Sequence, residues 1–301
     1  MEKTKEPKVL SETRWNDPSF RSELESRVWT SSPVVRRYLH RLASGDENCD
    51  WLTYVESRHL APSLESALVL GCGGGWLERA VAGRGRFRSI IACDFAADSV
   101  ARARDEATAA GFPGIDYRVV DLEHEALGGP YDAVFANDVL HHITNLEGLY
   151  ERILHSLAPE GKFIFSEYVG PNRFQYSDQR MDLVNRYLRL LPDRLRQDPS
   201  LGSATIRKER PDAAQVARED PTEAVRSEEV VPLVRRYFRT EREYPYGGSL
   251  LNPLLADIIV NFSEEVPEDV RLLEVLCGAE DRLIRSGLLE PDFVIFVGAR
   301  P

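Results

Sequence analysis

Cysteines and long apolar runs are both scarce in this 301-residue chain. The four cysteines, Cys49, Cys72, Cys93 and Cys277, form no C-x-x-C pair, so their spacing supports neither a zinc site nor a disulfide framework. No window reaches the roughly 18 consecutive apolar residues of a membrane span. The charged first residues are not followed by the apolar segment of a signal peptide. We therefore expect a cytoplasmic protein with no membrane partner.

Positive charge is also in short supply. Lys and Arg number 38 against 49 Asp and Glu, which gives a formal net charge of -11. Proteins that bind nucleic acid need a surface excess of Lys and Arg to neutralise phosphates, so we expect no nucleic-acid partner. A hydrophobic share of 43% and a charged share of 29% are typical of a folded globular protein.

Short apolar runs alternate with helical segments between residue 66 and about residue 170. This alternation is typical of βαβ units and predicts a parallel sheet. An alanine-rich helix is predicted over Val100–Ala110, and a capping box from Thr144 to Glu147 is predicted to begin a helix that runs through Leu157. The predicted strands are Ala67–Leu70, Ser89–Cys93, Asp116–Val120, Asp132–Ala136 and Lys162–Ser166.

The regions on either side of this alternation follow other patterns. Residues before about 30 lack periodicity and are predicted to form an irregular arm, after which Ser32-Pro33 predicts the start of an amphipathic helix. Residues 193–224 are predicted to form a loop or several short helices. The remaining predictions are helices over Met181–Leu191, Leu250–Phe262 and Val270–Ile284 and strands over Thr240–Tyr244 and Asp292–Val297.

A glycine-rich turn, Gly71-Cys72-Gly73-Gly74-Gly75, follows the first predicted strand. Glycines there permit positive φ and let a ligand lie against bare backbone. A dinucleotide-binding turn would need a further glycine three residues after Gly73, and that position is Trp76. The indole would prevent the close helix approach that a pyrophosphate requires. The turn therefore suits a ligand without a pyrophosphate.

Acidic residues end the second and third predicted strands. Asp94 lies 19 residues beyond Gly75, where a carboxylate can accept hydrogen bonds from both ribose hydroxyls. The alternative is that Asp94 only caps the helix that begins near Ala96. Asp121-Leu122 is placed to meet an adenine edge, although acidic residues commonly follow strands.

Together with the segment from Tyr131 to His142, these features resemble the class I S-adenosylmethionine-dependent methyltransferases, in particular small-molecule or sugar O-methyltransferases with an L-H-H motif. The turn Leu157-Ala158-Pro159-Glu160-Gly161 resembles the L-x-P-G-G turn of that family. The resemblance covers residues 66 to about 170. It implies an α/β fold with a Rossmann-like, doubly wound, seven-stranded sheet whose last strand is antiparallel. It also implies S-adenosylmethionine as cofactor and S-adenosylhomocysteine as product. The implied cofactor-binding residues are Gly71, Cys72, Gly73, Gly75, Asp94, Phe95, Asp121, Leu122 and Asn137.

One position departs from the family pattern. Family members commonly carry Asp or Glu where this chain has Val69. That acid helps to hold the methionine amino group, so we expect backbone carbonyls near Gly71 and Asn137 to do more of this work.

Two adjacent histidines are the candidate catalytic residues. His141 and His142 follow the fourth strand, and Glu167 ends the fifth. Methylation of a hydroxyl requires removal of its proton, and histidine suits that task. We predict that His141, ahead of His142, is the general base and that Glu167 orients it or binds substrate. The alternative is that one histidine only packs under the following helix.

Other chemistries find less support. The N-P-P-Y motif of enzymes that methylate exocyclic amines is absent, because Asn137-Asp138-Val139-Leu140 stands in its place. A magnesium-assisted mechanism would need clustered oxygen ligands, and no metal site is predicted. Methylation of a small amine and a non-catalytic S-adenosylmethionine-binding subunit remain alternatives.

The expected organisation is an N-terminal helical lid (1–60), a cofactor-binding core (61–170), a helical cap (171–245) and a segment that completes the sheet (246–301). The acceptor is expected to be a small molecule, most simply a sugar or secondary metabolite hydroxyl, and the protein a monomer or homodimer. Arg173 and Arg180 can bind a phosphate or carboxylate or lie on a solvated helix face. The predicted acceptor-binding residues are Tyr168, Asn172, Arg173 and Tyr176.

Overall fold

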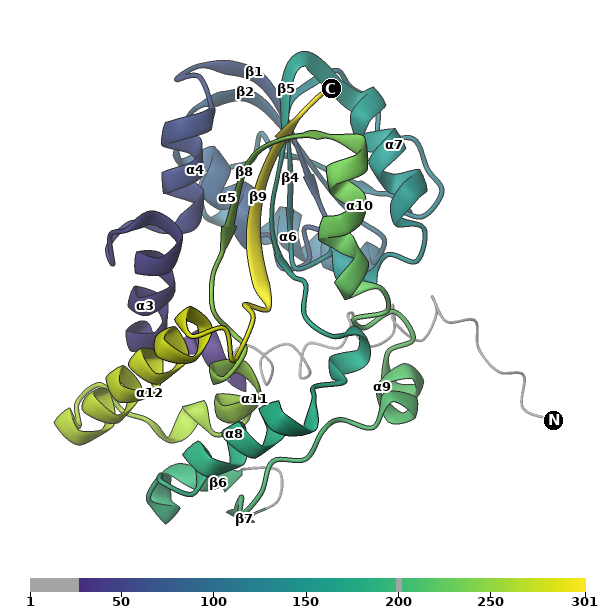
Figure 1. Ribbon diagram of the computed structural model, residues 1–301. Helices are drawn as coiled ribbons and strands as arrows, with labels where there is room; N and C mark the ends of the chain where they lie inside the picture. The colour runs from purple at the N-terminus through teal and green to yellow at the C-terminus, as the bar shows by residue number, and fades with distance from the viewer. Residues whose placement is uncertain (1–26, 199–201) are drawn as a thin grey trace.

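The computed structural model describes residues 27–198 and 202–301, so most of the predicted N-terminal arm lies outside the described residues. Its centre is a seven-stranded sheet in the order β3-β2-β1-β4-β5-β9-β8 (Figure 1). Strands β1 to β5 are parallel to one another, whereas β9 is antiparallel to both of its neighbours. The predicted seven-stranded sheet with an antiparallel last strand is therefore confirmed. Its strands are β1 (Leu64–Leu70), β2 (Phe87–Asp94), β3 (Asp116–Val119), β4 (Tyr131–Asn137), β5 (Leu157–Tyr168), β8 (Arg239–Pro245) and β9 (Phe293–Ala299).

Helices cover both faces of the sheet (Figure 1). On one face, α7 (Leu146–Ser156) and α10 (Val230–Tyr237) bury their apolar sides against β4 and β5. The Tyr150 hydroxyl donates to the carbonyl of Val230 at 3.0 Å and joins these two helices. The other face is covered by α4 (Trp51–His59), α5 (Trp76–Gly83) and α6 (Ala97–Ala109).

A helical lobe lies at the carboxyl edge of the parallel strands, at the bottom of the view in Figure 1. It has its own apolar core of leucine, valine and aromatic side chains. The Arg180 guanidinium forms a buried ion pair with Asp292 and donates to the carbonyl of Ser249 at 2.6 Å, which anchors the lobe to the start of β9. The lobe consists of η1 (Trp29–Ser31), α3 (Pro33–Ser44), α8 (Asp178–Leu188), α11 (Leu251–Leu255), η6 (Ile259–Asn261) and α12 (Pro267–Arg285).

The predicted capping box at Thr144 is wrong by one residue. The N-cap of α7 is Asn145, whose side chain accepts the N–H of Gly148 at 3.0 Å. Thr144 instead donates its N–H and its hydroxyl to Glu123, at 2.7 and 2.8 Å. Glu147 forms an ion pair with Arg226. Tertiary partners therefore displace the local motif.

The helix predicted over Leu250–Phe262 is also wrong, because the segment forms α11 and η6 with a break between them. Asp257 takes a left-handed φ of 69° at the break. Its N–H donates to the carbonyl of Arg27 at 3.3 Å instead of continuing the helix.

Residues 193–224, predicted to form a loop or short helices, contain four short elements and no long helix in their described part. The predicted strand over Thr240–Tyr244 is confirmed as β8. No helix among the described residues is long and apolar enough to cross a membrane. The four short elements within residues 193–224 are η4 (Asp193–Arg196), β6 (Gln197–Asp198), β7 (Ser203–Ala204) and α9 (Ala213–Glu219).

Candidate active site

The glycine turn links β1 to α5 at the carboxyl edge of the sheet. Gly71, Gly73 and Gly75 have φ values of 60°, 50° and 80°, in the left-handed region that favours glycine. A Cβ on Gly71 would also lie 2.8 Å from the Cβ of Val139, closer than real side chains come. At Gly73 and Gly74 a Cβ would meet nothing within 4 Å. The middle of the turn is therefore open to a ligand, while Gly71 is packed against the segment after β4.

Asp94 joins this turn to the end of β2. One carboxylate oxygen accepts the N–H of Gly73 at 2.9 Å, and the other accepts the N–H of Ala96 at 3.0 Å. Because Ala96 is the N-cap of α6, the bond to Ala96 is the local contact expected if Asp94 caps that helix. The bond to Gly73 brings Asp94 to the turn as well, so the turn and the carboxylate form one unit.

The other predicted cofactor-binding residues surround this unit to different extents. Leu122 is 6% exposed and its side chain packs in the core under α7, so only its backbone can face a ligand. Asp121 accepts the N–H of Glu123 at 3.0 Å in a local turn. Phe95 and Asn137 are partly exposed, and Cys72 is buried. Val69 is fully buried in the core, so its side chain contacts protein and not the turn's open side.

Glu167 at the end of β5 organises the histidine pair. One of its oxygens accepts the N–H groups of Val139 and Leu140, at 2.9 and 2.6 Å. The other accepts the N–H of Tyr168 at 2.8 Å and also contacts Nδ1 of His141. An ionised carboxylate can only accept hydrogen bonds, so Nδ1 of His141 carries a proton; when the imidazole is neutral, its lone pair is on Nε2.

His142 is held in the same way by a second chain of hydrogen bonds. The Thr222 hydroxyl donates to Asp220 at 2.7 Å. Thr222 Oγ1 lies 3.1 Å from Nδ1 of His142 and, with its own proton engaged, accepts from it. Nε2 of His142 is therefore the nitrogen that carries the lone pair.

Residues 220–225, which we call the strap, cross the histidine pair. The N–H of Val225 donates to the carbonyl of His141 at 3.0 Å. The strap brings the carboxylate of Glu223 to 3.5 Å from Nε2 of His141 and 3.9 Å from Nε2 of His142. Glu223 was not predicted as a site residue.

Arg173 holds the strap in place. Its guanidinium donates to the carbonyls of Asp220 and Glu223, at 3.1 and 2.6 Å, and to that of Pro221. Its own N–H donates to the carbonyl of Ala224 at 2.8 Å. Arg173 and the buried Ala224 both have left-handed φ values, of 53° and 46°. In this conformation the guanidinium is directed to the protein backbone rather than to an open site.

The remaining predicted acceptor-binding residues lie at different distances from the histidines. The Tyr168 ring stands edge-on to His141, with ring centroids 6.1 Å apart. Tyr176 is buried under the Arg180 guanidinium, 4.2 Å from the ring centroid. Asn172 accepts the N–H of Glu228 at 3.1 Å, and so does not reach the histidines. Of these four residues, Tyr168 is the one whose side chain contacts His141.

Negative charge dominates the electrostatics of this cluster. Burial lowers the pKa of His141, but Glu167, Glu223 and Asp138 outweigh that effect and raise the pKa to about 9. Burial and the charge of His141 lower the pKa of His142. Burial and Glu167 raise the pKa of Asp138 to about 7. The Asp138 residue is nevertheless exposed by its accessible surface.

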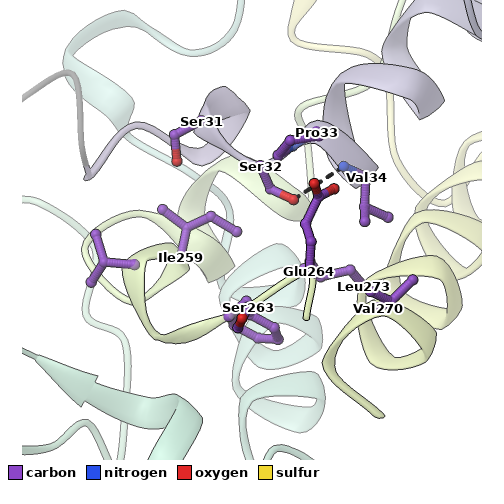
Figure 2. Close-up of a pocket in the computed structure, with 11 residues that line it drawn as sticks. Ser31, Ser32, Pro33, Val34, Ile259, Ser263, Glu264, Val270 and Leu273 are labelled. Atoms are coloured by element: carbon purple, nitrogen blue, oxygen red, sulfur yellow. Dashed lines mark hydrogen bonds between the residues drawn. The ribbon is translucent and has the colours of Figure 1, made fainter. Parts of the chain in front are cut away.

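A separate hollow in the helical lobe lies away from these residues (Figure 2). It lies between the N-terminus of α3 and the segment from η6 to α12. Ser32, which lines it, caps α3 by accepting the N–H of Val34 at 3.2 Å. None of the predicted site residues lines this hollow, so it is not the candidate active site.

Comparison with known proteins agrees with this geometry. Residues 68–165 match the family model described as "Methyltransferase domain". Over 140 residues the chain is 33% identical to the ubiquinone biosynthesis O-methyltransferase of Xanthomonas axonopodis pv. citri, covering 46% of this chain and 55% of the relative. It is 27% identical over 124 residues to the malonyl-[acyl-carrier protein] O-methyltransferase of Bacillus anthracis, covering 41% and 45%. The chain thus spans about half the length of these curated relatives.

Solved structures share the fold at low sequence identity. The N-methyltransferase NodS from Bradyrhizobium japonicum WM9, in complex with S-adenosyl-L-homocysteine, aligns with a TM-score of 0.50 and 11% identity over 98% of this chain and 97% of its own. The Haemonchus contortus phosphoethanolamine N-methyltransferase 2, in complex with S-adenosyl-L-methionine, aligns with a TM-score of 0.51 and 15% identity over 95% of this chain and 60% of its own. The strand order, the glycine turn with Asp94 and the family match together identify residues 68–165 as a class I S-adenosylmethionine-dependent methyltransferase domain.

Proposed function

We propose that this protein transfers the methyl group of S-adenosylmethionine to a hydroxyl oxygen of a small acceptor, such as a sugar or secondary metabolite. The observation that carries the proposal is the pairing of His141 with Glu167 at the sheet edge where the glycine turn and Asp94 also lie. The O-methyltransferase names of the curated relatives support oxygen as the methylated atom.

In this mechanism the acceptor oxygen attacks the methyl carbon in line with the departing sulfur. A carbon–oxygen bond forms and the carbon–sulfur bond breaks, and its electron pair converts the sulfonium into the thioether of S-adenosylhomocysteine. The hydroxyl proton passes to Nε2 of His141, the nitrogen that Glu167 leaves available by holding Nδ1. Only the neutral form of His141 can accept this proton, and because its pKa is raised to about 9, that form becomes more abundant as pH rises toward 9. Glu167 thus orients the base and stabilises its charged form.

The cofactor would lie across the turn from Gly71 to Gly75, with its ribose hydroxyls on Asp94. Asp121 and the backbone of Leu122 would face the adenine, and the carbonyls near Gly71 and Asn137 would hold the amino group that Val69 cannot bind. Tyr168 and the strap would form the walls of the acceptor site. Asn172, Arg173 and Tyr176 would shape that site indirectly, because their side chains hold neighbouring segments.

A second candidate is methylation of a small amine. The three carboxylates of Asp138, Glu167 and Glu223 surround the histidines, and such a site favours an acceptor that carries positive charge. An amine acceptor must be neutral to attack, but it needs no strong base. The two candidates therefore differ in their dependence on the histidines.

Steady-state kinetics of His141→Ala and His142→Ala test the proposal with a panel of sugar, phenolic and amine acceptors. We expect His141→Ala to lower kcat by about 100-fold or more for a hydroxyl acceptor, the usual range for loss of a general base. Unchanged kcat in both variants would remove the histidine mechanism and favour amine methylation. Binding of S-adenosylhomocysteine without turnover of any acceptor would instead indicate a non-catalytic cofactor-binding subunit.

A further inference from the structure

Three metal-binding side chains converge from two distant segments of the chain. His141 and His142 lie in η2 (Leu140–His142), and Glu223 lies in the strap. One potential ligand atom from each residue lies within 4.8 Å of the other two. This is a grouping of two imidazoles and one carboxylate.

The two imidazoles present the same nitrogen to Glu223. Glu167 accepts a hydrogen bond from Nδ1–H of His141. Thr222, whose hydroxyl donates to Asp220, accepts one from Nδ1–H of His142. In the neutral tautomers, both Nε2 atoms are acceptors, and so are the oxygens of Glu223. When both imidazoles are deprotonated at Nε2, these three groups can therefore act together as ligands of one cation.

The separations around Glu223 are compatible with ligands of one ion. An imidazolium paired with Glu223 would close to about 2.7–3.2 Å, whereas the observed separations are 3.5 and 3.9 Å. Two ligands on one tetrahedral ion, each about 2.1 Å from it, lie about 3.4 Å apart. A divalent ion between the three groups would contact all of them at once.

The outer contacts are those expected around metal ligands. A ligating histidine usually donates its second nitrogen to a carboxylate or another acceptor, which fixes the ring. Here Glu167 and Thr222 do this for the two histidines. Arg173 fixes the third ligand by holding the backbone of Glu223 itself at 2.6 Å.

We propose that His141, His142 and Glu223 bind a divalent transition-metal ion of the Zn²⁺ or Co²⁺ type. Two of the three donors are imidazole nitrogens, which suit such ions better than Mg²⁺. Three protein ligands leave at least one position open for water or for an acceptor oxygen.

The ion-bound and ion-free forms use His141 differently. With an ion on Nε2, His141 is a ligand and cannot accept the acceptor's proton, so the base mechanism above applies to the ion-free form. Metal binding itself depends on neither the cofactor nor the acceptor. The protein can therefore fail to bind metal and still transfer methyl groups, or bind metal and transfer none.

The test is calorimetric titration of ZnCl₂ into protein that carries no polyhistidine tag and has been stripped with EDTA, with Co²⁺ absorption as a second readout. We expect one ion per chain and visible Co²⁺ bands. Glu223→Gln and His142→Ala should each weaken Zn²⁺ binding by at least about 10-fold, since even loss of an outer contact costs about 10–100-fold. The matched control is Glu219→Gln, which removes an exposed carboxylate from the nearby helix α9 and should leave affinity unchanged.

Binding of S-adenosylhomocysteine by every variant establishes that the fold is intact, because the glycine turn makes no use of Glu223. Equal Zn²⁺ affinity in the wild type and both ligand variants would mean an adventitious ion only and would overturn the proposal. Absence of binding in the wild type would also overturn it. Mg²⁺ competing equally with Zn²⁺ would contradict the argument from the donor set.

Discussion

The N–H of Gly73 donates to the Asp94 carboxylate at 2.9 Å, and so the glycine turn after β1 is bonded directly to the end of β2. Asp94 is only 8% exposed, so the bond lies in a largely desolvated setting where hydrogen bonds to a charged group are strong. A cofactor that lies on the turn and reaches Asp94 with its ribose would therefore find the turn and the Asp94 carboxylate already held in position.

Replacement of Asp94 by Ala should weaken S-adenosylhomocysteine binding by about 10- to 100-fold, because a hydrogen bond to a charged group contributes about 1.5–3 kcal/mol. Isothermal titration calorimetry measures this directly. Asp98→Asn, an exposed acid in the first turn of α6, is the matched control and should bind as the wild type does. NADH should bind neither protein, and equal binding of NADH and S-adenosylhomocysteine would contradict the account of the turn.

Gly71→Ala should abolish measurable cofactor binding or destabilise the protein, whereas Gly74→Ala should be tolerated. At Gly71 a Cβ meets Val139 and the φ of 60° is unfavourable for alanine. At Gly74 a Cβ meets nothing within 4 Å. Thermal unfolding and S-adenosylhomocysteine titration of the two variants provide the comparison, and similar losses in both would contradict the packing described for Gly71.

Glu167→Gln should destabilise the fold by about 1–3 kcal/mol and lower kcat. The NH₂ group of the glutamine would face backbone N–H groups that now donate to a carboxylate oxygen, so these N–H groups would lose their acceptor. A buried donor without an acceptor costs about 1–3 kcal/mol. Denaturant unfolding gives the stability, and turnover with a hydroxyl acceptor gives kcat. A variant with wild-type stability and kcat would show that Glu167 neither shapes the segment after β4 nor orients His141.

Arg173→Ala should impair acceptor turnover while leaving S-adenosylhomocysteine binding unchanged. The variant loses the bonds that hold the strap against the histidines, and the glycine turn makes no contact with Arg173. Arg186→Ala, which removes an exposed arginine from α8, serves as the control. If Arg173→Ala weakened cofactor binding but spared turnover, Arg173 would act on the cofactor and not on the strap.

Glu78→Gln should change how stability depends on pH. Burial raises the pKa of Glu78 to about 7 from an ordinary value of 4.5, so the folded state binds a proton that the unfolded state releases. Stability from this group is therefore present below pH 4.5 and is lost as pH rises to 7, by up to about 3 kcal/mol. In urea unfolding at pH 5 and pH 8, the free energy of unfolding of the variant relative to the wild type should be higher at pH 8 than at pH 5. An equal difference at both pH values would contradict this.

The parts of the fold that follow from local pattern were predictable. Strands β1, β4 and β5 are largely apolar runs that stay strands because both faces of the sheet are buried there. The glycine turn after β1 and the acid at the end of β2 were also predictable as structural features, because their positions depend on spacing along the chain. The helix predicted over Leu250–Phe262 failed because Asp257 bonds to Arg27, a contact that periodicity cannot reveal.

The acceptor side of the site was less predictable. Glu223 is far from His141 along the chain and lies in a charged stretch whose composition indicates a solvated face. Its place beside the histidines depends on Arg173 and on the left-handed turn at Ala224. For the same reason Arg173 was predicted as a ligand-binding residue although its guanidinium holds backbone. An acid four residues before a serine, in Arg-rich and Glu-rich sequence, carries no signal of such a contact.

Transfer of an isotopically labelled methyl group from S-adenosylmethionine, followed by mass spectrometry over sugar, phenolic and amine acceptors, tests the central claim most directly. The account predicts a labelled, methylated product together with an equal amount of S-adenosylhomocysteine, and loss of both in Asp94→Ala at limiting cofactor. Tight binding of S-adenosylmethionine with no labelled product from any acceptor class would contradict it.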